Sequence, residues 1–243
     1  MLGTVQKGRR VAFFGGSFDP PHRGHLAVAR AARQALSLDA VLFAPVGSQP
    51  LKPRGSTASF ADRLAMTRLA IAGEPGFEIS LADAPTEARG TEPRQTPNYT
   101  IDTLHALRAA HPADTLFCLM GADSFRALGR WHRGAEIPFA APLIVASRPG
   151  QNLQDLAAIL PAGLSIRQEE AAAAPGAVEL RTYTLRNAAG ELTPFYLLPG
   201  LHEDMSASEI RRLARAAHGR PPAQTGLLST AVAAYLVEHG LYR

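Results

Sequence analysis

Two histidines spaced three residues apart, His22 and His25, lie in a stretch rich in glycine and proline near the start of the chain. Gly15 and Gly16 open this stretch, and the absence of a Cβ there lets main-chain N–H groups approach a ligand closely. The alanine-rich run after His25 predicts a helix, whose first turn offers unpaired N–H groups and a positive dipole end. Histidines at this spacing can face the same ligand. This combination suits binding of an anion such as a phosphate group.

The loop differs from the two common glycine-rich phosphate motifs. It lacks the closing Lys and Ser or Thr of a P-loop and the Gly-x-Gly-x-x-Gly spacing of dinucleotide-binding proteins. Instead, Gly24 separates the histidines, which leaves space for a phosphate beside the main chain. A single histidine in such a place is more often a hydrogen-bonded structural residue, whereas the pair within this loop favours a functional role.

A strand and a helix must flank this loop to hold it. The apolar run 11–14 before the glycines is short and continuous, as is typical of a strand buried on both faces of a parallel sheet. Similar runs recur at 40–44, 77–81, 116–120 and 143–146. Helical patterns lie between the runs at 26–36, 60–71 and 100–110. Ser59 with Asp62 resembles a capping box at the second of these helices.

This alternation predicts the fold class. Strands that alternate with helices favour an α/β protein with a Rossmann-like, doubly wound parallel sheet that carries helices on both faces. In such folds, ligands bind beyond the carboxyl ends of the strands. The loop after Phe14, Lys52 after the second strand and Asp123 after the fourth strand all lie at that edge. We therefore expect one site there.

Length and composition fit a single domain. A chain of 243 residues, 46% of them hydrophobic, can bury a full core, and we expect one domain over 1–243. The net charge of +4 comes from arginines that are dispersed along the chain rather than grouped in a basic block. Nucleic-acid binding is therefore a weak explanation of this charge. The apolar stretch after Arg9 and Arg10 is too short for a signal peptide or a membrane span, so we expect a cytoplasmic protein without a membrane partner. Cys118, the only cysteine, is expected to be a buried thiol.

The later part of the domain is expected to hold an elaboration at 151–200 and a C-terminal helical part at 206–243. Within the elaboration, the sequence predicts a short helix over 151–160. It also predicts a hairpin, with strands at 178–185 and 192–198. Whether this elaboration forms a surface lobe or contacts another subunit stays open.

The stretch 15–26 resembles the loop of the nucleotidyltransferase superfamily that carries a His-x-Gly-His signature, and within it the bacterial nicotinate-nucleotide adenylyltransferase family. Further segments match that family's pattern in the same order, and they are 97–104, 121–124 with Trp131, 143–145 with 148–150, 206–211 and 240–243. The matches span nearly the whole chain except 151–200.

The resemblance implies a reaction in which the phosphate of a pyridine mononucleotide attacks the α-phosphorus of ATP, giving a dinucleotide and pyrophosphate. The nucleophile is already ionised, so positioning and charge stabilisation remain the enzyme's tasks. The resemblance implies that His22 and His25 are catalytic and contact the triphosphate, with Gly16, Ser17 and Phe18 beside them. Mg²⁺ is expected with ATP and needs few protein ligands, so no metal-binding residue is predicted.

A second phosphate contact is implied at the start of a helix expected to run to about residue 217. Ser206 or Ser208 would cap this helix, and these serines with Ile210 and Arg211 would clamp the leaving pyrophosphate. An ordinary helix cap beside a solvated arginine is the simpler alternative. Lys52 is implied to reach a phosphate as well.

The acceptor site is implied at Tyr99, Thr100 and Trp131, where an aromatic face and free N–H groups would receive the pyridine ring and its carboxylate. Asp123 would bind a ribose hydroxyl, or it caps a helix instead. Arg148 matches a family arginine or is a surface residue. The family's Pro-Pro-His-Lys run is altered here, since the chain keeps the lysine at its end and lacks the histidine.

The expected partners are therefore ATP and nicotinate mononucleotide. One alternative is another adenylyltransferase of the superfamily, with nicotinamide mononucleotide or phosphopantetheine as the acceptor. A nucleotide-binding protein without catalytic activity is a second alternative, and a nucleic-acid-binding protein ranks last. The residues do not decide between the acid and the amide mononucleotide, and a homo-oligomer stays open.

Overall fold

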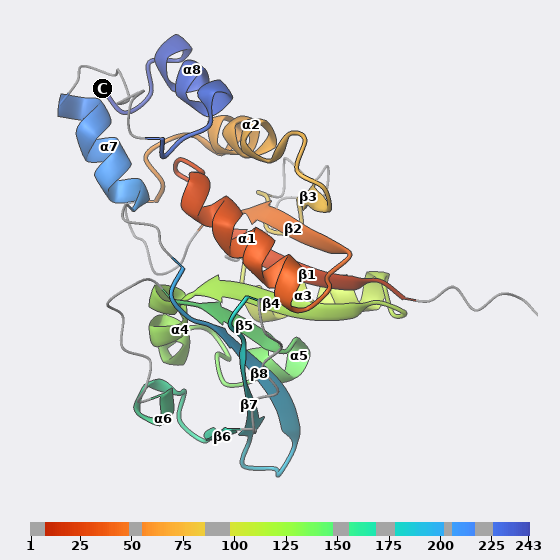
Figure 1. Ribbon diagram of the computed structural model, residues 1–243. Helices are drawn as coiled ribbons and strands as arrows, with labels where there is room; N and C mark the ends of the chain where they lie inside the picture. The colour runs from red at the N-terminus through yellow and green to blue at the C-terminus, as the bar shows by residue number, and fades with distance from the viewer. Residues whose placement is uncertain are drawn as a thin grey trace, which may run out of the picture.

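The computed structural model describes residues 8–48, 55–85, 98–147, 156–168, 178–201, 206–216 and 226–243. These residues form an eight-stranded sheet with the order β3-β2-β1-β4-β5-β8-β7-β6 (Figure 1). The strands are β1 (Arg10–Gly16), β2 (Ala40–Pro45), β3 (Phe77–Ile79), β4 (Thr115–Gly121), β5 (Leu143–Ala146), β6 (Ser165–Gln168), β7 (Arg181–Arg186) and β8 (Leu192–Leu198). The helices are α1 (Arg23–Ala35), α2 (Phe60–Ile71), α3 (Thr100–Ala110), α4 (Ala122–Ala127), the 3₁₀ turn η2 (Leu128–Arg130), α5 (Ile137–Ala140), α6 (Leu156–Ile159), α7 (Ala207–Ala216) and α8 (Thr230–Glu238).

The sheet is parallel from β3 through β2, β1, β4 and β5 to β8. The chain first builds outward from β1 to β2 and β3, and then crosses back to place β4 on the other side of β1. This reversal leaves a crevice between the loops that follow β1 and β4, which is where ligands bind in open α/β sheets. The predicted fold class is therefore confirmed.

Side chains alternate between two buried faces of the sheet, which explains why the strands appear as continuous apolar runs. On one face, Phe13 and Met120 pack with residues of α3, α4 and α5. On the other face, Phe14 and Leu119 pack with residues of α1. Helices consequently cover both faces (Figure 1).

The helix starts follow local side-chain chemistry. At α2 the Asp62 N–H donates to Ser59 Oγ at 3.1 Å, and the Ser59 hydroxyl donates to Asp62 Oδ2 at 2.6 Å, which confirms the predicted cap. Helix α1 begins three residues earlier than its apolar pattern predicts, because His22 already occupies the N-cap position. Helix α3 has the predicted bounds.

The predicted hairpin is confirmed, with β7 and β8 antiparallel and joined by a turn in which the Gly190 N–H donates to the Asn187 carbonyl at 3.0 Å. Strand β8 also pairs in parallel with β5, where Val145 is the partner of Leu197. The hairpin thus continues the central sheet. Helix α6 covers part of the helix predicted over 151–160, whose first half lies outside the described residues.

Helices α7 and α8 do not pack on the sheet core. They form a separate apolar cluster with α2, whose buried members are Ala58, Met66, Ala70, Ala214, Val232, Leu236 and Tyr242. This cluster lies at the end of the molecule opposite β6 and β7 (Figure 1). Among the described residues, no helix combines the length and apolar character that crossing a membrane requires.

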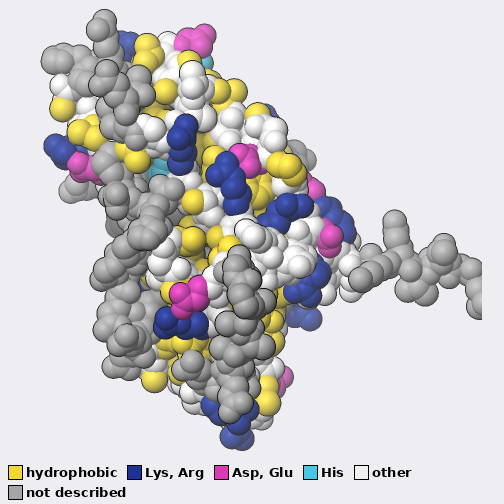
Figure 2. All heavy atoms as spheres, in the orientation of Figure 1, with side chains coloured by type: hydrophobic (Ala, Val, Ile, Leu, Met, Phe, Trp, Pro, Cys, Tyr) yellow, Lys and Arg dark blue, Asp and Glu magenta, His cyan; other side chains and the backbone are white. Residues whose placement is uncertain are grey.

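The surface mixes charges of both signs. Several arginines pair with nearby carboxylates, among them Arg30 with Glu74 and Arg212 with Glu209. Figure 2 shows basic and acidic side chains interspersed over the visible face. Nearby carboxylates therefore neutralise part of the positive charge of the dispersed arginines.

Candidate active site

A cavity of about 800 Å³ opens beyond the carboxyl ends of β1 and β4. This volume lies in the range typical of small-molecule sites. Most of the predicted site residues line it, and these are Gly16, Ser17, Phe18, His22, His25, Tyr99, Thr100, Asp123, Trp131, Ser206, Ser208 and Arg211. Ile210 does not line the cavity, because its side chain is buried under α7. Lys52 and Arg148 lie outside the described residues.

The loop between β1 and α1, residues 17–22, is anchored by an aromatic side chain. Phe18 has a φ of 47°, and its ring is buried with centroid distances of 5.5 Å to Phe14 and 5.6 Å to Phe43. A positive φ is unusual for a residue with a bulky side chain, so the ring packing must hold the main chain there. The peptide bond between Asp19 and Pro20 is cis. Packing therefore fixes the loop before any ligand binds.

The two histidines meet at the head of α1. The His22 N–H donates to Nδ1 of His25 at 3.1 Å, and the ring centroids lie 3.8 Å apart. Because Nδ1 of His25 accepts this bond, its Nε2 carries the proton in the neutral ring and acts as a donor. The rings of His25 and Phe18 also meet in a T-shaped arrangement, at a centroid distance of 5.0 Å. The loop thus brings both imidazoles to the cavity wall.

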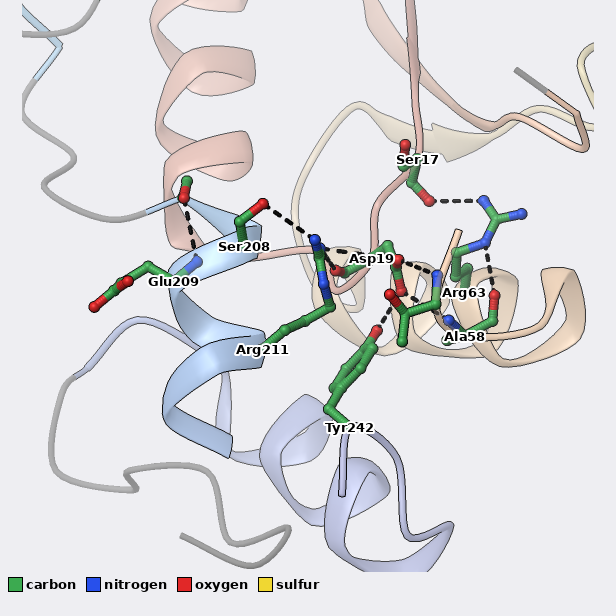
Figure 3. Close-up of polar contacts among 10 residues, drawn as sticks. Ser17, Asp19, Ala58, Arg63, Ser208, Glu209, Arg211 and Tyr242 are labelled. Carbon is green, nitrogen blue, oxygen red and sulfur yellow. Dashed lines mark hydrogen bonds and ion pairs between the residues drawn. The ribbon is translucent and has the colours of Figure 1, made fainter. Parts of the chain in front are cut away.

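A second helix terminus faces the same cavity. The Glu209 N–H donates to Ser206 Oγ at 3.2 Å, so Ser206, rather than Ser208, caps α7. Arg211 donates from one nitrogen to Ser208 Oγ at 3.1 Å and from the other to the Asp19 carbonyl at 2.7 Å (Figure 3). Arg211 therefore ties α7 to the loop between β1 and α1.

Asp19 is a site residue that the sequence did not single out. Its buried carboxylate accepts hydrogen bonds from the Thr57 N–H at 2.6 Å, the Ala58 N–H at 3.1 Å and the Tyr242 hydroxyl at 2.6 Å (Figure 3). Burial and the bond to Asp19 raise the pKa of the Tyr242 phenol, which stays protonated and remains a donor. Asp19 and Tyr242 both lie in segments that match the family pattern, and this match was the feature of the sequence that could have identified them as site residues.

Arg63 of α2 is a second site residue that was not identified from the sequence. The residue is 2% exposed, and its guanidinium donates to the carbonyls of Ser17 at 2.7 Å, Val46 at 2.8 Å and Ala58 at 3.3 Å. Burial lowers the pKa of Arg63, and the nearby Asp19 carboxylate opposes this shift. A single arginine thus links the loop between β1 and α1, the end of β2 and the start of α2.

The opposite wall of the cavity begins at the head of α3. Tyr99 occupies the N-cap position without a side-chain cap, and its ring stacks on His132 with a centroid distance of 4.2 Å. Trp131 is half-buried beside them. This wall offers aromatic faces next to the first N–H groups of a helix, a combination that suits a flat ring bearing an anionic group.

Asp83 anchors this wall to the rest of the site. Its carboxylate is buried and accepts a hydrogen bond from the Thr103 hydroxyl at 2.5 Å, and its main-chain carbonyl accepts from Asn98 Nδ2 at 2.8 Å. Cys118 lies on β4 at the base of the cavity. Burial, with a smaller contribution from Asp83, raises the pKa of its thiol to about 12. Cys118 is therefore a buried, protonated thiol, as expected.

Asp123 lies at the cavity rim with its side chain 70% exposed, 3.6 Å from Arg126. Gly121, not Asp123, is the N-cap residue of α4, so the capping role considered for this aspartate is not the one it has. Within the described residues, no group of three His, Cys, Asp or Glu side chains is arranged to hold a metal ion.

Comparison with known proteins places this fold in a family. The model of a family described as cytidylyltransferase-like matches residues 13–213. A probable nicotinate-nucleotide adenylyltransferase of Pelobacter propionicus is 37% identical over 233 residues, which cover 96% of this chain and 98% of that protein. A protein of the same name from Laribacter hongkongensis is 37% identical over 243 residues, which cover 99% of this chain and 97% of that protein.

A solved structure supports the fold independently. The nicotinic acid mononucleotide adenylyltransferase of Plasmodium falciparum, complexed with NaAD, superposes with a TM-score of 0.66 over 96% of this chain and 97% of its own. The sequences are 16% identical, so this likeness establishes the fold alone. Because the family model covers most of the chain and close relatives match it along nearly their full length, the chain belongs to the cytidylyltransferase-like family and, within it, to the nicotinate-nucleotide adenylyltransferases.

Proposed function

We propose that the chain transfers the adenylyl group of ATP to nicotinate mononucleotide, forming nicotinate adenine dinucleotide and releasing pyrophosphate. The observation that carries the proposal is the cavity itself. One wall joins two helix termini, two histidines and an arginine, and the other offers aromatic faces at the head of a third helix. The first wall suits a triphosphate, and the second suits a pyridine ring.

The triphosphate lies, in this proposal, between the N-termini of α1 and α7. Nε2 of His25 and the neighbouring His22 ring donate to its oxygens at the reacting phosphorus. Arg211 receives the β- and γ-phosphates, because a guanidinium donates two parallel hydrogen bonds to phosphate oxygens. Main-chain N–H groups of Gly16 and Ser17 supply further donors.

The acceptor occupies the opposite wall. Its pyridine ring stacks against the side chains of Tyr99 and Trp131, and its carboxylate faces the N–H groups of the first turn of α3, starting at Thr100. Asp123 lies at the rim and is suited to accept a hydrogen bond from a ribose hydroxyl. This arrangement points the 5′-phosphate of the acceptor toward the histidine pair.

In the reaction, an oxygen of the acceptor phosphate forms a bond to the α-phosphorus of ATP, and the bond from that phosphorus to the bridging oxygen of the β-phosphate breaks. The bonding electrons leave with pyrophosphate. The attacking oxygen is already anionic, so no proton has to be removed. Catalysis then comes from alignment and from donors that stabilise the charge at the α-phosphorus.

Magnesium belongs to the substrate in this scheme. Near the proposed triphosphate position, the described residues of the cavity offer imidazole and guanidinium nitrogens and serine hydroxyls, whereas Mg²⁺ at such sites is bound mainly by carboxylates, substrate phosphates and water. The ion would therefore be held by the phosphates of ATP and by water. No step assigned to the protein side chains depends on it.

The test is a comparison of acceptors. Purified protein is given ATP and Mg²⁺ with nicotinate mononucleotide, nicotinamide mononucleotide or phosphopantetheine, and pyrophosphate release is measured at steady state. We expect the highest kcat/KM with nicotinate mononucleotide. Turnover with phosphopantetheine alone, or ATP binding without pyrophosphate release from any acceptor, would overturn the proposal, and a preference for the amide would reassign the acceptor.

A further inference from the structure

Three segments far apart in the sequence converge on the carboxylate and carbonyl of Asp19. The N–H groups of Thr57 and Ala58, just before α2, and the hydroxyl of Tyr242 donate to its carboxylate. Arg211 donates to its carbonyl at 2.7 Å and lies 3.9 Å from its carboxylate (Figure 3). Asp19 is therefore one point at which the C-terminal part of the chain is fastened to the loop between β1 and α1, beside the bond from the Arg23 N–H to the Leu227 carbonyl.

The ring and the hydroxyl of Tyr242 make separate contacts. The ring is buried in the cluster formed by α2, α7 and α8, together with Met66 and Ala214. The hydroxyl extends beyond that cluster and bonds Asp19 Oδ1 at 2.6 Å. Removal of the hydroxyl alone would thus leave the apolar packing in place and release one constraint on Asp19.

Asp19 occupies a position from which small displacements reach the proposed chemistry. Two prolines follow it and lead directly to His22, so the main chain has few free torsions between the carboxylate and the histidine pair. Its carbonyl is also one of the two acceptors that orient Arg211. A shift of Asp19 would move both groups proposed to hold the triphosphate.

We propose that Tyr242 is a positioning residue for the triphosphate site, acting through the hydrogen bond from its hydroxyl to Asp19. This inference rests on the proposed function, because it assumes that the loop and Arg211 receive ATP. A residue that follows α8 then helps to set the geometry of the loop between β1 and α1.

Tyr235 provides a matched control. Its hydroxyl donates to Asp62 Oδ1 at 3.1 Å, which is also a tyrosine-to-aspartate bond between the C-terminal part of the chain and α2. Tyr235 does not line the cavity, and Asp62 belongs to the helix cap of α2 rather than to the site. Tyr235→Phe and Tyr242→Phe therefore delete the same chemical group from two tyrosine-to-aspartate bonds, and only the bond of Tyr242, the shorter and more buried one, ends on the loop.

The experiment measures MgATP binding by calorimetry, steady-state kcat and KM for both substrates, and thermal unfolding. We expect Tyr242→Phe to weaken MgATP binding and to lower kcat/KM for ATP by about tenfold, since misplaced groups lose much of their effect on the reaction. The KM for the acceptor should stay unchanged. Tyr235→Phe should lower the unfolding temperature by less than Tyr242→Phe does, because its bond is longer and only partly buried, and it should leave every kinetic constant at the wild-type value.

Asp19→Ala, which removes both acceptor oxygens, completes the test by a double-mutant comparison. If the hydroxyl acts through Asp19, adding Tyr242→Phe to Asp19→Ala should cause little further loss of MgATP affinity. Equal kinetics for Tyr242→Phe and Tyr235→Phe, or full additivity with Asp19→Ala, would overturn the inference. The binding measurement keeps it separate from the proposed function, because a wild-type protein that binds MgATP and fails to use nicotinate mononucleotide would contradict only the latter.

Discussion

The two walls of the cavity are held in different ways. The wall formed by the loop between β1 and α1 is fixed by buried ionisable side chains, with Asp19, Arg63 and Tyr242 each no more than 5% exposed. The wall at the head of α3 rests on one buried carboxylate, Asp83, and on the stacked rings of Tyr99 and an exposed His132. A highly charged triphosphate calls for donors fixed in advance, whereas a flat ring can be received by side chains that adjust.

This contrast predicts that substitutions of the buried ionisable residues that hold the first wall change folding and catalysis together. Those on the second wall should change the affinity for one substrate and leave the scaffold intact.

Arg63→Met should have the largest effect, because it removes a buried guanidinium that serves three main-chain carbonyls from three segments. A buried polar group that loses its partner costs about 1–3 kcal/mol, so we expect a loss of about 3 kcal/mol or more in the free energy of unfolding. Pyrophosphate release should be lost with it. Urea denaturation followed by circular dichroism measures the first effect.

Arg68→Met, an exposed arginine in the last turn of α2, is the matched control and should unfold like the wild type. A stable and active Arg63→Met protein would show that the first wall does not depend on its buried charge.

His25→Asn should lower the rate of pyrophosphate release by about 10²–10³, the effect of losing one donor at a developing charge. The asparagine oxygen can still accept the bond from the His22 N–H that Nδ1 accepts now, so the start of α1 should be preserved. His25→Ala removes both functions and should unfold at a lower temperature as well. Wild-type turnover by His25→Asn would show that the His25 imidazole does not take part in catalysis.

The sequence predicted the elements around these residues because their signals are local. A continuous apolar run is the direct mark of a strand buried on both faces, and Ser59 with Asp62 marks the start of α2 within one turn. Arg63 carries no such mark. An arginine in a helix is usually solvated, and its burial here depends on carbonyls supplied by three separate segments.

Contacts between residues far apart in the sequence could not be predicted either. The bond between Tyr242 and Asp19 joins residues 223 positions apart, and neither periodicity nor spacing encodes such a pair. Likewise, the turn between the two predicted strands of the hairpin indicated that they pair with each other, and nothing in either strand indicated that β8 would also join β5. The site residues that were predicted came from motifs, whose roles at this site stay predictions.

His132→Ala tests the second wall. Loss of the ring stacked on Tyr99 should raise the KM for the pyridine mononucleotide by about fivefold, as expected for one aromatic contact, and leave the KM for ATP unchanged. His111→Ala, which removes an exposed histidine from the other end of α3, should change neither constant. An equal rise in both KM values would mean that the two walls are not independent.

The smallest expected effect concerns the exposed pair of Asp123 and Arg126, and it separates a substrate contact from a surface ion pair. Asp123→Ala and Arg126→Ala break the same 3.6 Å interaction, yet only Asp123 lines the cavity. Exposed pairs of this kind often contribute nothing measurable to stability, so both variants should unfold like the wild type. If the Asp123 carboxylate accepts a hydrogen bond from the acceptor's ribose, its removal alone should raise the KM for the mononucleotide by about twofold. Identical kinetics for the two variants would leave Asp123 as part of a surface ion pair and confine acceptor recognition to the aromatic side chains and the first turn of α3.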